Sequence, residues 1–116
     1  MSVKPIPVPL GDYRRTMDNR NGFDAMQGYL ALPAPAVIEK PDAVHVTLHD
    51  PDDLAYWVVS LGGDIHVGSP TDGAALWTLH TQTPRRADGS TVTILVHVAV
   101  VDGTDVLTEV RRAVAA

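Results

Sequence analysis

The sequence contains no cysteine. Disulfides, thiolate zinc sites and cysteine nucleophiles are therefore excluded as sources of stability or chemistry. The chain also lacks any apolar run approaching the ~20 residues that cross a bilayer, and its N-terminal segment does not follow the pattern of a signal peptide. We therefore expect a cytoplasmic protein with no membrane partner.

The motifs that usually announce an enzyme or a nucleotide-binding protein are also missing. Gly62-Gly63 follows an expected helix and does not open one, so it is no phosphate loop or dinucleotide fingerprint. Ser60, Ser69 and Ser90 lack the strand-to-helix elbow of hydrolases. With 9 Lys and Arg against 14 Asp and Glu, the net charge of -5 disfavours nucleic acid as a partner. We therefore expect a non-enzymatic protein without a resident cofactor.

What remains is the composition of one small globular domain. The 116 residues are 45% hydrophobic and 20% charged, which suits a single core. Residues 1–41 contain repeated prolines, which resist regular structure, so we predict a Pro-rich arm followed by an α+β domain over 42–116. Within the arm, Phe23, Met26 and Leu30 have helical spacing and predict a short helix over 22–32.

The best-marked elements lie just after the arm. Residues 43–49 alternate, with Val44, Val46 and Leu48 on one face, and predict a half-buried strand. Asp50 and Pro51 then mark the start of a helix over 51–61, with an N-cap and a proline in the first turn. Gly62-Gly63 ends that helix.

The remaining elements complete an order of β-α-β-β-β-α. Strands are predicted over 65–67, 75–81 and 91–101, the last of them central, with a final helix over 105–115. We therefore expect a four-stranded, mainly antiparallel sheet with helices on one face. The predicted core consists of Val44, Val46, Leu48, Leu54, Trp57, Val58, Leu61, Trp77, Ile94, Val96 and Val98.

The 5 histidines are the one chemical constellation in the chain. Strand phasing sends all of them to the sheet face away from the helices. The predicted binding face comprises His45, Thr47, His49, His66, His80, Thr93, Leu95 and His97. Imidazoles on neighbouring strands could hold a divalent metal, but His and Thr are also ordinary residues of a solvated sheet face. Both interpretations stay open from the sequence.

The same face also carries Leu95, Ala99 and Val101, and an apolar patch of this kind usually marks a contact. The apolar residues of the arm are the nearest candidate cover, namely Ile6, Val8, Leu10, Phe23 and Met26. A second copy of the chain is the other candidate. We expect the arm to meet this patch, within one chain or across a homodimer.

A family resemblance rests on a few quoted residues. The run His45-Val46-Thr47-Leu48-His49-Asp50, followed by Tyr56-Trp57 and Leu61-Gly62 in a β-α-β-β-β order, resembles one module of the vicinal oxygen chelate family of glyoxalases and bleomycin-resistance proteins. The resemblance spans roughly residues 43–101 and implies metal ligands on the first and last strands, here His45 and His97. The family has two modules per site, so the resemblance implies a homodimer. The last strand has no glutamate, and neither the arm nor the final helix belongs to the pattern.

Two hypotheses follow from the sequence. The first is a small accessory protein that self-associates, or contacts a protein partner, through the His/Thr face or the arm. The second is a metal-binding or small-ligand-binding homodimer that uses His45 and His97.

Overall fold

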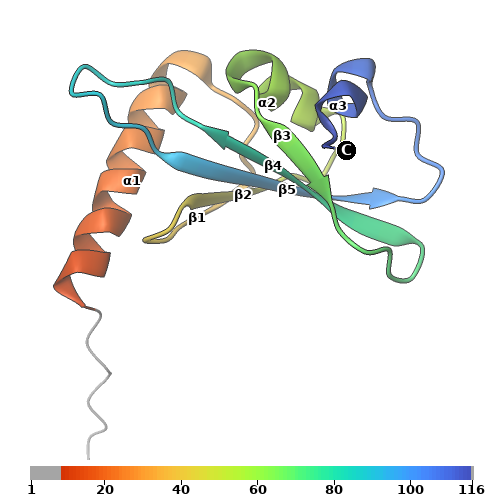
Figure 1. The fold of residues 1–116 in the computed structure, drawn as a ribbon, viewed down its shortest axis with the longest axis horizontal. Coiled ribbons are helices and arrows are strands. Elements are labelled where there is room, and N and C mark those ends of the chain that lie inside the picture. Colours follow the sequence, from red (N-terminus) through yellow and green to blue (C-terminus); the bar gives the residue numbers. More distant parts are fainter. Residues whose placement is uncertain (1–8, 116) are drawn as a thin grey trace, which may run out of the picture.

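The computed structural model describes residues 9–115 as an α+β fold, with one mixed five-stranded sheet and three helices (Figure 1). Along the chain the elements are α1 (Leu10–Leu30), β1 (Ala36–Glu39), β2 (Val44–Thr47), α2 (Asp53–Leu61), β3 (Asp64–Val67), β4 (Ala74–Gln82), β5 (Thr93–Val101) and α3 (Thr108–Ala113). The predicted order of elements after residue 42 is confirmed, and α1 and β1 are added in front of it.

The sheet order is β1-β2-β5-β4-β3, so β5 is the central strand, as predicted. After β2 the chain crosses through α2 to β3 at the far edge and returns through β4, so that β5 lies parallel to β2. The other three pairings are antiparallel. The expected four strands are therefore wrong in number, because β1 adds a fifth strand on the outer side of β2.

Strand β1 lies inside the segment that the prolines marked as an arm. Pro33 and Pro35 precede it and Pro41 follows it, so no proline interrupts its four residues. Lys40 N–H donates to the Ala43 carbonyl at 2.9 Å and closes the turn between β1 and β2. An edge strand tolerates such flanking prolines because only one of its sides must pair. The pairing crosses the expected boundary between residues 41 and 42.

The core lies between the sheet and the helices. Trp57 is fully buried, its ring stacks on Phe23 at a centroid distance of 6.3 Å, and its Nε1–H donates to the Pro33 carbonyl at 2.9 Å. The predicted core is confirmed for most residues, but Val58, Leu61 and Trp77 are only partly buried against it. These three residues lie at the edge of the layer between the helices and the sheet.

Helix α1 is the largest departure from the predicted arm. It runs for 21 residues instead of a short turn over 22–32, yet it buries only Gly22, Phe23 and Met26. Such a narrow buried stripe leaves little apolar periodicity along the rest of the helix, which is why the sequence showed only part of it. Phe23 and Met26 belong to the helix-side core, so the expectation that they cover the opposite sheet face is wrong.

The other arm residues that were expected to cover the opposite sheet face do not cover it either, within the residues that the structure describes. Leu10 is 64% exposed, and Ile6 and Val8 lie outside the described residues. Figure 1 shows the C-terminal half of α1 on the same side of the sheet as α2 and α3, and its first turns extending past the sheet.

The helix ends also differ from prediction by a few residues. α2 begins at Asp53, because residues 51 and 52 form a turn in which Asp50 Oδ1 accepts the Asp52 N–H at 2.9 Å. α3 covers only Thr108–Ala113, and beyond it Ala115 N–H donates to the Ile65 carbonyl at 2.9 Å. That bond covers part of the outer edge of β3. Within residues 9–115, no helix is long and apolar enough to cross a membrane.

Candidate functional site on the open face of the sheet

The sheet face opposite the core has no helix over it in the described part of the chain, and we call it the open face (Figure 1). It consists of the residues that alternate with the core positions: Ala36, Ile38, His45, Thr47, Asp64, His66, Ala74, Leu76, Thr78, His80, Gln82, Thr93, Leu95, His97, Ala99 and Val101. Residues paired across strands point to the same side. The strand register therefore decides which side chains meet.

Two rows of paired residues bring the histidines onto this face. In one row Leu95 lies between His45 and His80. In the next row His97 lies between Thr47 and Thr78, and Thr78 pairs in turn with His66. The predicted phase is therefore confirmed for the four histidines that lie in strands.

His45 and His97 are in polar contact on the open face. Their rings stack at a centroid distance of 5.4 Å and an interplanar angle of 13°, with His45 Nδ1 3.1 Å from His97 Nε2. The two histidines are not paired directly across the strands, because His45 pairs with Leu95 and His97 pairs with Thr47. They are diagonal neighbours on β2 and β5. The parallel pairing of β2 with β5 thus creates this contact.

Both outer nitrogens of this pair have a polar neighbour. Thr78 Oγ1 lies 2.9 Å from His97 Nδ1. Asp42 Oδ2 lies 3.5 Å from His45 Nε2 without hydrogen-bond geometry, so this buried nitrogen has no hydrogen-bond partner within residues 9–115. A self-consistent assignment of protons has Thr78 donating to His97 Nδ1 and His97 Nε2–H donating to His45 Nδ1.

The charge state of His97 follows from its surroundings. Burial is the main cause that lowers the pKa of His97 below the ordinary 6.5, and the nearby His45, His80 and Lys40 lower it further. All of these effects disfavour the protonated ring. His97 is therefore neutral near pH 7, with a nitrogen lone pair able to accept a hydrogen or bind a metal.

The remaining histidines fall into a second pair and a single residue. His66 and His80 meet edge to face at a centroid distance of 4.3 Å. His49 follows the end of β2, is exposed and takes part in neither ring pair. The predicted set of five is thus divided into two pairs, and His49 stands apart from them. Thr93, the first residue of β5, is exposed on the same face of the sheet.

Large apolar side chains accompany the histidines. Ile38, Leu76 and Val101 are 60%, 52% and 64% exposed. Sequence reasoning missed Ile38 because β1 was not predicted, although the residues Ala-Val-Ile-Glu between Pro35 and Pro41 are compatible with a short strand. It also passed over Leu76, which the phase of β4 would have placed outward. These residues make the open face more apolar than a purely solvated sheet face.

One chain alone offers an incomplete set of metal ligands. Within residues 9–115, no group of three or more His, Cys, Asp or Glu side chains is placed to hold a metal ion. The two facing nitrogens of His45 and His97, 3.1 Å apart, do suit two ligands of one tetrahedral ion, whose nitrogens lie about 3.3 Å apart when the bonds are about 2.0 to 2.1 Å. A metal would therefore need further ligands from outside residues 9–115.

Comparison with known proteins adds no further guide to the site. The chain matches no protein-family model, no curated protein and no solved structure. The contacts described above are therefore the basis for the function proposed below.

Proposed function

We propose that this chain is a self-associating binding module, and that two copies meet through their open faces. The observation that supports this proposal is the exposure of Ile38, Leu76 and Val101 on a sheet face that no helix covers in the described residues. An antiparallel or mixed sheet that faces water on one side normally presents polar residues there. Leu76 and Val101 are diagonal neighbours on β4 and β5, and large exposed apolar residues on such a face instead indicate a contact surface.

The chemistry of the face favours a second copy as the occupant. The chain carries a net charge of -5, yet Asp64 is the only carboxylate among the strand residues of the open face, and Asp42 adds one at its border beside His45. A nearly neutral face can meet its own copy without like-charge repulsion, whereas the remaining acidic surface repels a second copy. A two-fold axis would place apolar residues of one copy on those of the other.

The size of the face also suits a dimer. Five strands about 4.8 Å apart, with four to nine residues of about 3.3 Å each, give a footprint of roughly 24 Å by 13 to 30 Å. This footprint is of the same order as the ~800 Å² that each partner contributes to an interface of standard size.

Sedimentation velocity over a concentration series tests this proposal. The wild-type chain should sediment as a dimer, and Leu76→Glu, which places a charge on the open face, should be monomeric. Val59→Glu is the matched control, because Val59 is 72% exposed on α2, on the other side of the sheet. Circular dichroism should show that both variants fold. A wild-type monomer at all concentrations, or equal effects of the two variants, would contradict the proposal.

A second candidate function is metal binding by the His45 and His97 pair in such a dimer, as the vicinal oxygen chelate resemblance implies. The specific observation in its favour is that each outer nitrogen has a polar neighbour of the kind that orients a ligand imidazole. With metal on His45 Nδ1 and His97 Nε2, the opposite N–H groups would face Asp42 and Thr78, at 3.5 Å and 2.9 Å. Such outer partners fix the tautomer and the orientation of ligand histidines.

Metal content of tag-free protein separates this second function from simple self-association. Bound zinc should reach about one ion per two chains if each copy supplies two histidines. His97→Gln should abolish binding, whereas His66→Gln, which alters the other ring pair, should retain it. A dimer without stoichiometric metal after zinc addition would leave self-association standing and reject the metal site.

A further inference from the structure

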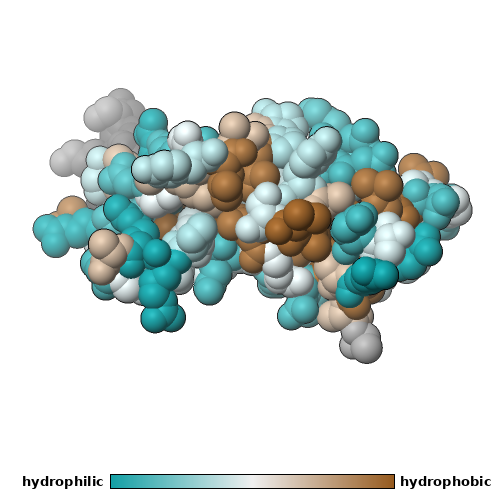
Figure 2. Space-filling view, turned by 90° about the horizontal axis from the view of Figure 1, so that it is seen from above, coloured by the Kyte–Doolittle hydropathy of each residue, from teal (hydrophilic) through white to brown (hydrophobic). Residues whose placement is uncertain are grey.

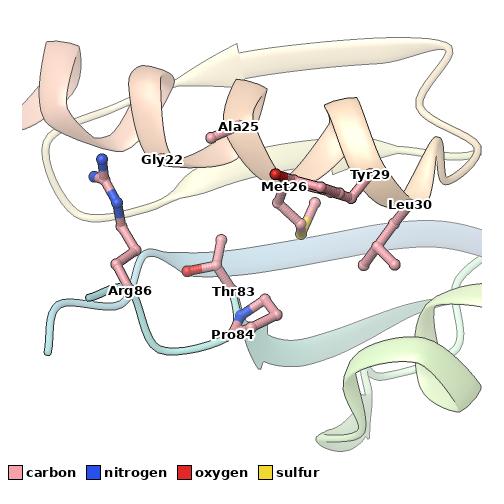
Figure 3. Close-up of a pocket in the computed structure, with 8 residues that line it drawn as sticks. All are labelled: Gly22, Ala25, Met26, Tyr29, Leu30, Thr83, Pro84 and Arg86. Carbon is pink, nitrogen blue, oxygen red and sulfur yellow. The ribbon is translucent and has the colours of Figure 1, made fainter.

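A pocket on the helix side of the molecule is unrelated to the open face. Its volume is about 270 Å³, close to the lower end of the ~300 to 1,000 Å³ typical of ligand sites. One wall is the C-terminal half of α1, and the other is the segment that follows β4 (Figure 3). Seen from the helix side, hydrophobic residues gather near the middle of a mostly polar surface (Figure 2).

The pocket exists because α1 comes very close to the start of β5. A Cβ atom on Gly22 would lie 2.5 Å from Val92 Cγ2, so only glycine permits this approach. Glycine in the middle of a helix costs up to ~1 kcal/mol of helix stability relative to alanine. Further along α1 the two walls are separated, and the pocket opens between them.

The lining of the pocket is almost wholly apolar. Met26 and Pro84 face each other across it, and Leu30 points into its far end (Figure 3). Leu30 is 39% exposed and Tyr29 is 92% exposed at the rim, so large apolar side chains of α1 remain in water beside an open pocket. A ligand with an apolar body would bury them.

The opposite end of the pocket is bordered by Arg86, the one charged residue among those that line it. Arg86 extends from its loop toward α1, and its Nη1 would lie 3.6 Å from a Cβ on Gly22 (Figure 3). Thr83 is 3% exposed and its Oγ1 accepts the Val92 N–H at 2.9 Å, so its hydroxyl belongs to the wall of the pocket. Within residues 9–115, no carboxylate lies within ion-pair distance of Arg86, and its charge is one of the lesser causes that lower the pKa of Asp88 in the same loop.

The loop that carries Arg86 is held by its own hydrogen bonds. Arg86 N–H donates to the Ser90 carbonyl, and Gly89 N–H donates to the Arg86 carbonyl, both at 2.9 Å. Asp88 Oδ1 accepts from the Ser90 hydroxyl at 2.6 Å and from the Ser90 N–H at 2.9 Å. These bonds lower the pKa of Asp88, so the carboxylate stays ionised and the turn persists at neutral pH. The backbone of Arg86 is therefore fixed beside the pocket.

From this arrangement we propose that the pocket binds a small anionic amphiphile, a carboxylate with a short apolar chain. The chain would lie against Met26, Leu30 and Pro84, and the carboxylate would pair with Arg86. Arginine suits this role because its planar guanidinium donates to both oxygens of a carboxylate. The open face takes no part in this binding.

The test uses decanoate, below its critical micelle concentration, with decanol and decylamine as neutral and cationic probes of equal chain length. Isothermal titration calorimetry should show decanoate binding about tenfold or more tightly than decanol, and no binding of decylamine. Arg86→Gln should abolish the preference for decanoate. Arg85→Gln is the matched control, because Arg85 is the adjacent arginine and does not line the pocket.

A second measurement places the ligand. In protein with ¹³C-labelled methionine methyls, decanoate should shift the signal of Met26, which lines the pocket, and leave that of Met17 on the same helix unchanged. Ala25→Leu, which fills the pocket from an exposed position of α1, should block both the shift and the heat of binding. Decanoate binding that ignores charge, or that Arg85→Gln weakens as much as Arg86→Gln does, would overturn the proposal. An unshifted Met26 methyl at saturating decanoate would overturn it as well.

Discussion

The imidazoles of His45 and His97, 52 residues apart in the chain, stack on the open face with two ring nitrogens 3.1 Å apart. Adjacent parallel strands bring them together, and burial keeps the pKa of His97 below its ordinary value. Protonation of the partly buried His97 therefore costs free energy in the folded chain that it does not cost in the unfolded chain. The pair therefore links the stability of the sheet to pH.

We predict that the free energy of unfolding falls as the pH is lowered through 6.5, the ordinary pKa of histidine, toward the lower pKa of His97 in the folded chain. In this window the unfolded chain binds a proton that the native chain does not, so stability rises with pH. Urea unfolding at several pH values measures the slope. His97→Gln should flatten it, and Thr47→Ser, a change at the paired position on β2, should keep it. A slope that His97→Gln leaves intact would assign the effect to other groups.

Trp57→Ala should lower the free energy of unfolding by ~3 to 5 kcal/mol, because it empties a fully buried site and removes the partner of the Pro33 carbonyl. Urea denaturation monitored by circular dichroism measures this loss. The neighbouring Tyr56 is 61% exposed, so Tyr56→Ala should cost no more than ~0.5 kcal/mol. Similar losses in both variants would contradict the packing described for α2.

Two glycines of α1 should respond in opposite directions to alanine. Gly28→Ala meets no atom within 4 Å and should raise the free energy of unfolding by ~0.5 to 1 kcal/mol, through helix propensity. Gly22→Ala gains the same propensity but drives a methyl group into buried Val92, and overpacking costs ~1 to 3 kcal/mol. Thermal unfolding of the two variants should show a higher melting temperature for the first and a lower one for the second. Stabilisation by both would mean that α1 does not lie so close to β5.

Helix α1 should prove to be part of the folded core. Phe23 is 3% exposed and stacks on Trp57, so Phe23→Ala should cost ~3 to 5 kcal/mol. Tyr29, on the same helix and 92% exposed, supplies the control, since Tyr29→Ala removes almost no packing. Denaturant titration compares the two. A chain that tolerates Phe23→Ala as well as Tyr29→Ala would indicate that α1 behaves as an independent arm.

Local signals in the sequence were reliable where one residue decides a backbone feature or where one face of an element is buried throughout. The alternation of Val44 and Val46 predicted β2, and Gly62, with a positive φ of 71°, ends α2 where expected. The same alternation put His45, His66, His80 and His97 on one side of the sheet. These features depend on neighbours a few residues away.

Other features depended on partners that are distant in the chain. β1 has only four residues and is a strand because β2 offers it an edge, while the length of α1 rests on two side chains that reach the core near Trp57. A periodicity cannot reveal a short edge strand or a helix with so narrow a buried stripe. The prolines around β1 were therefore interpreted as an arm.

The sequence by itself determined the α+β class, the order of elements after residue 42 and the side of the sheet on which each strand histidine lies, because alternation and helix-stop signals act locally. Only the tertiary structure decided that His45 meets His97 while His49 meets neither pair, since this depends on the parallel pairing of β2 with β5. It alone also placed Arg86 beside α1, where Gly22 allows the helix to approach β5. Contacts between segments far apart in the chain follow from how the layers stack, and no local pattern encodes that.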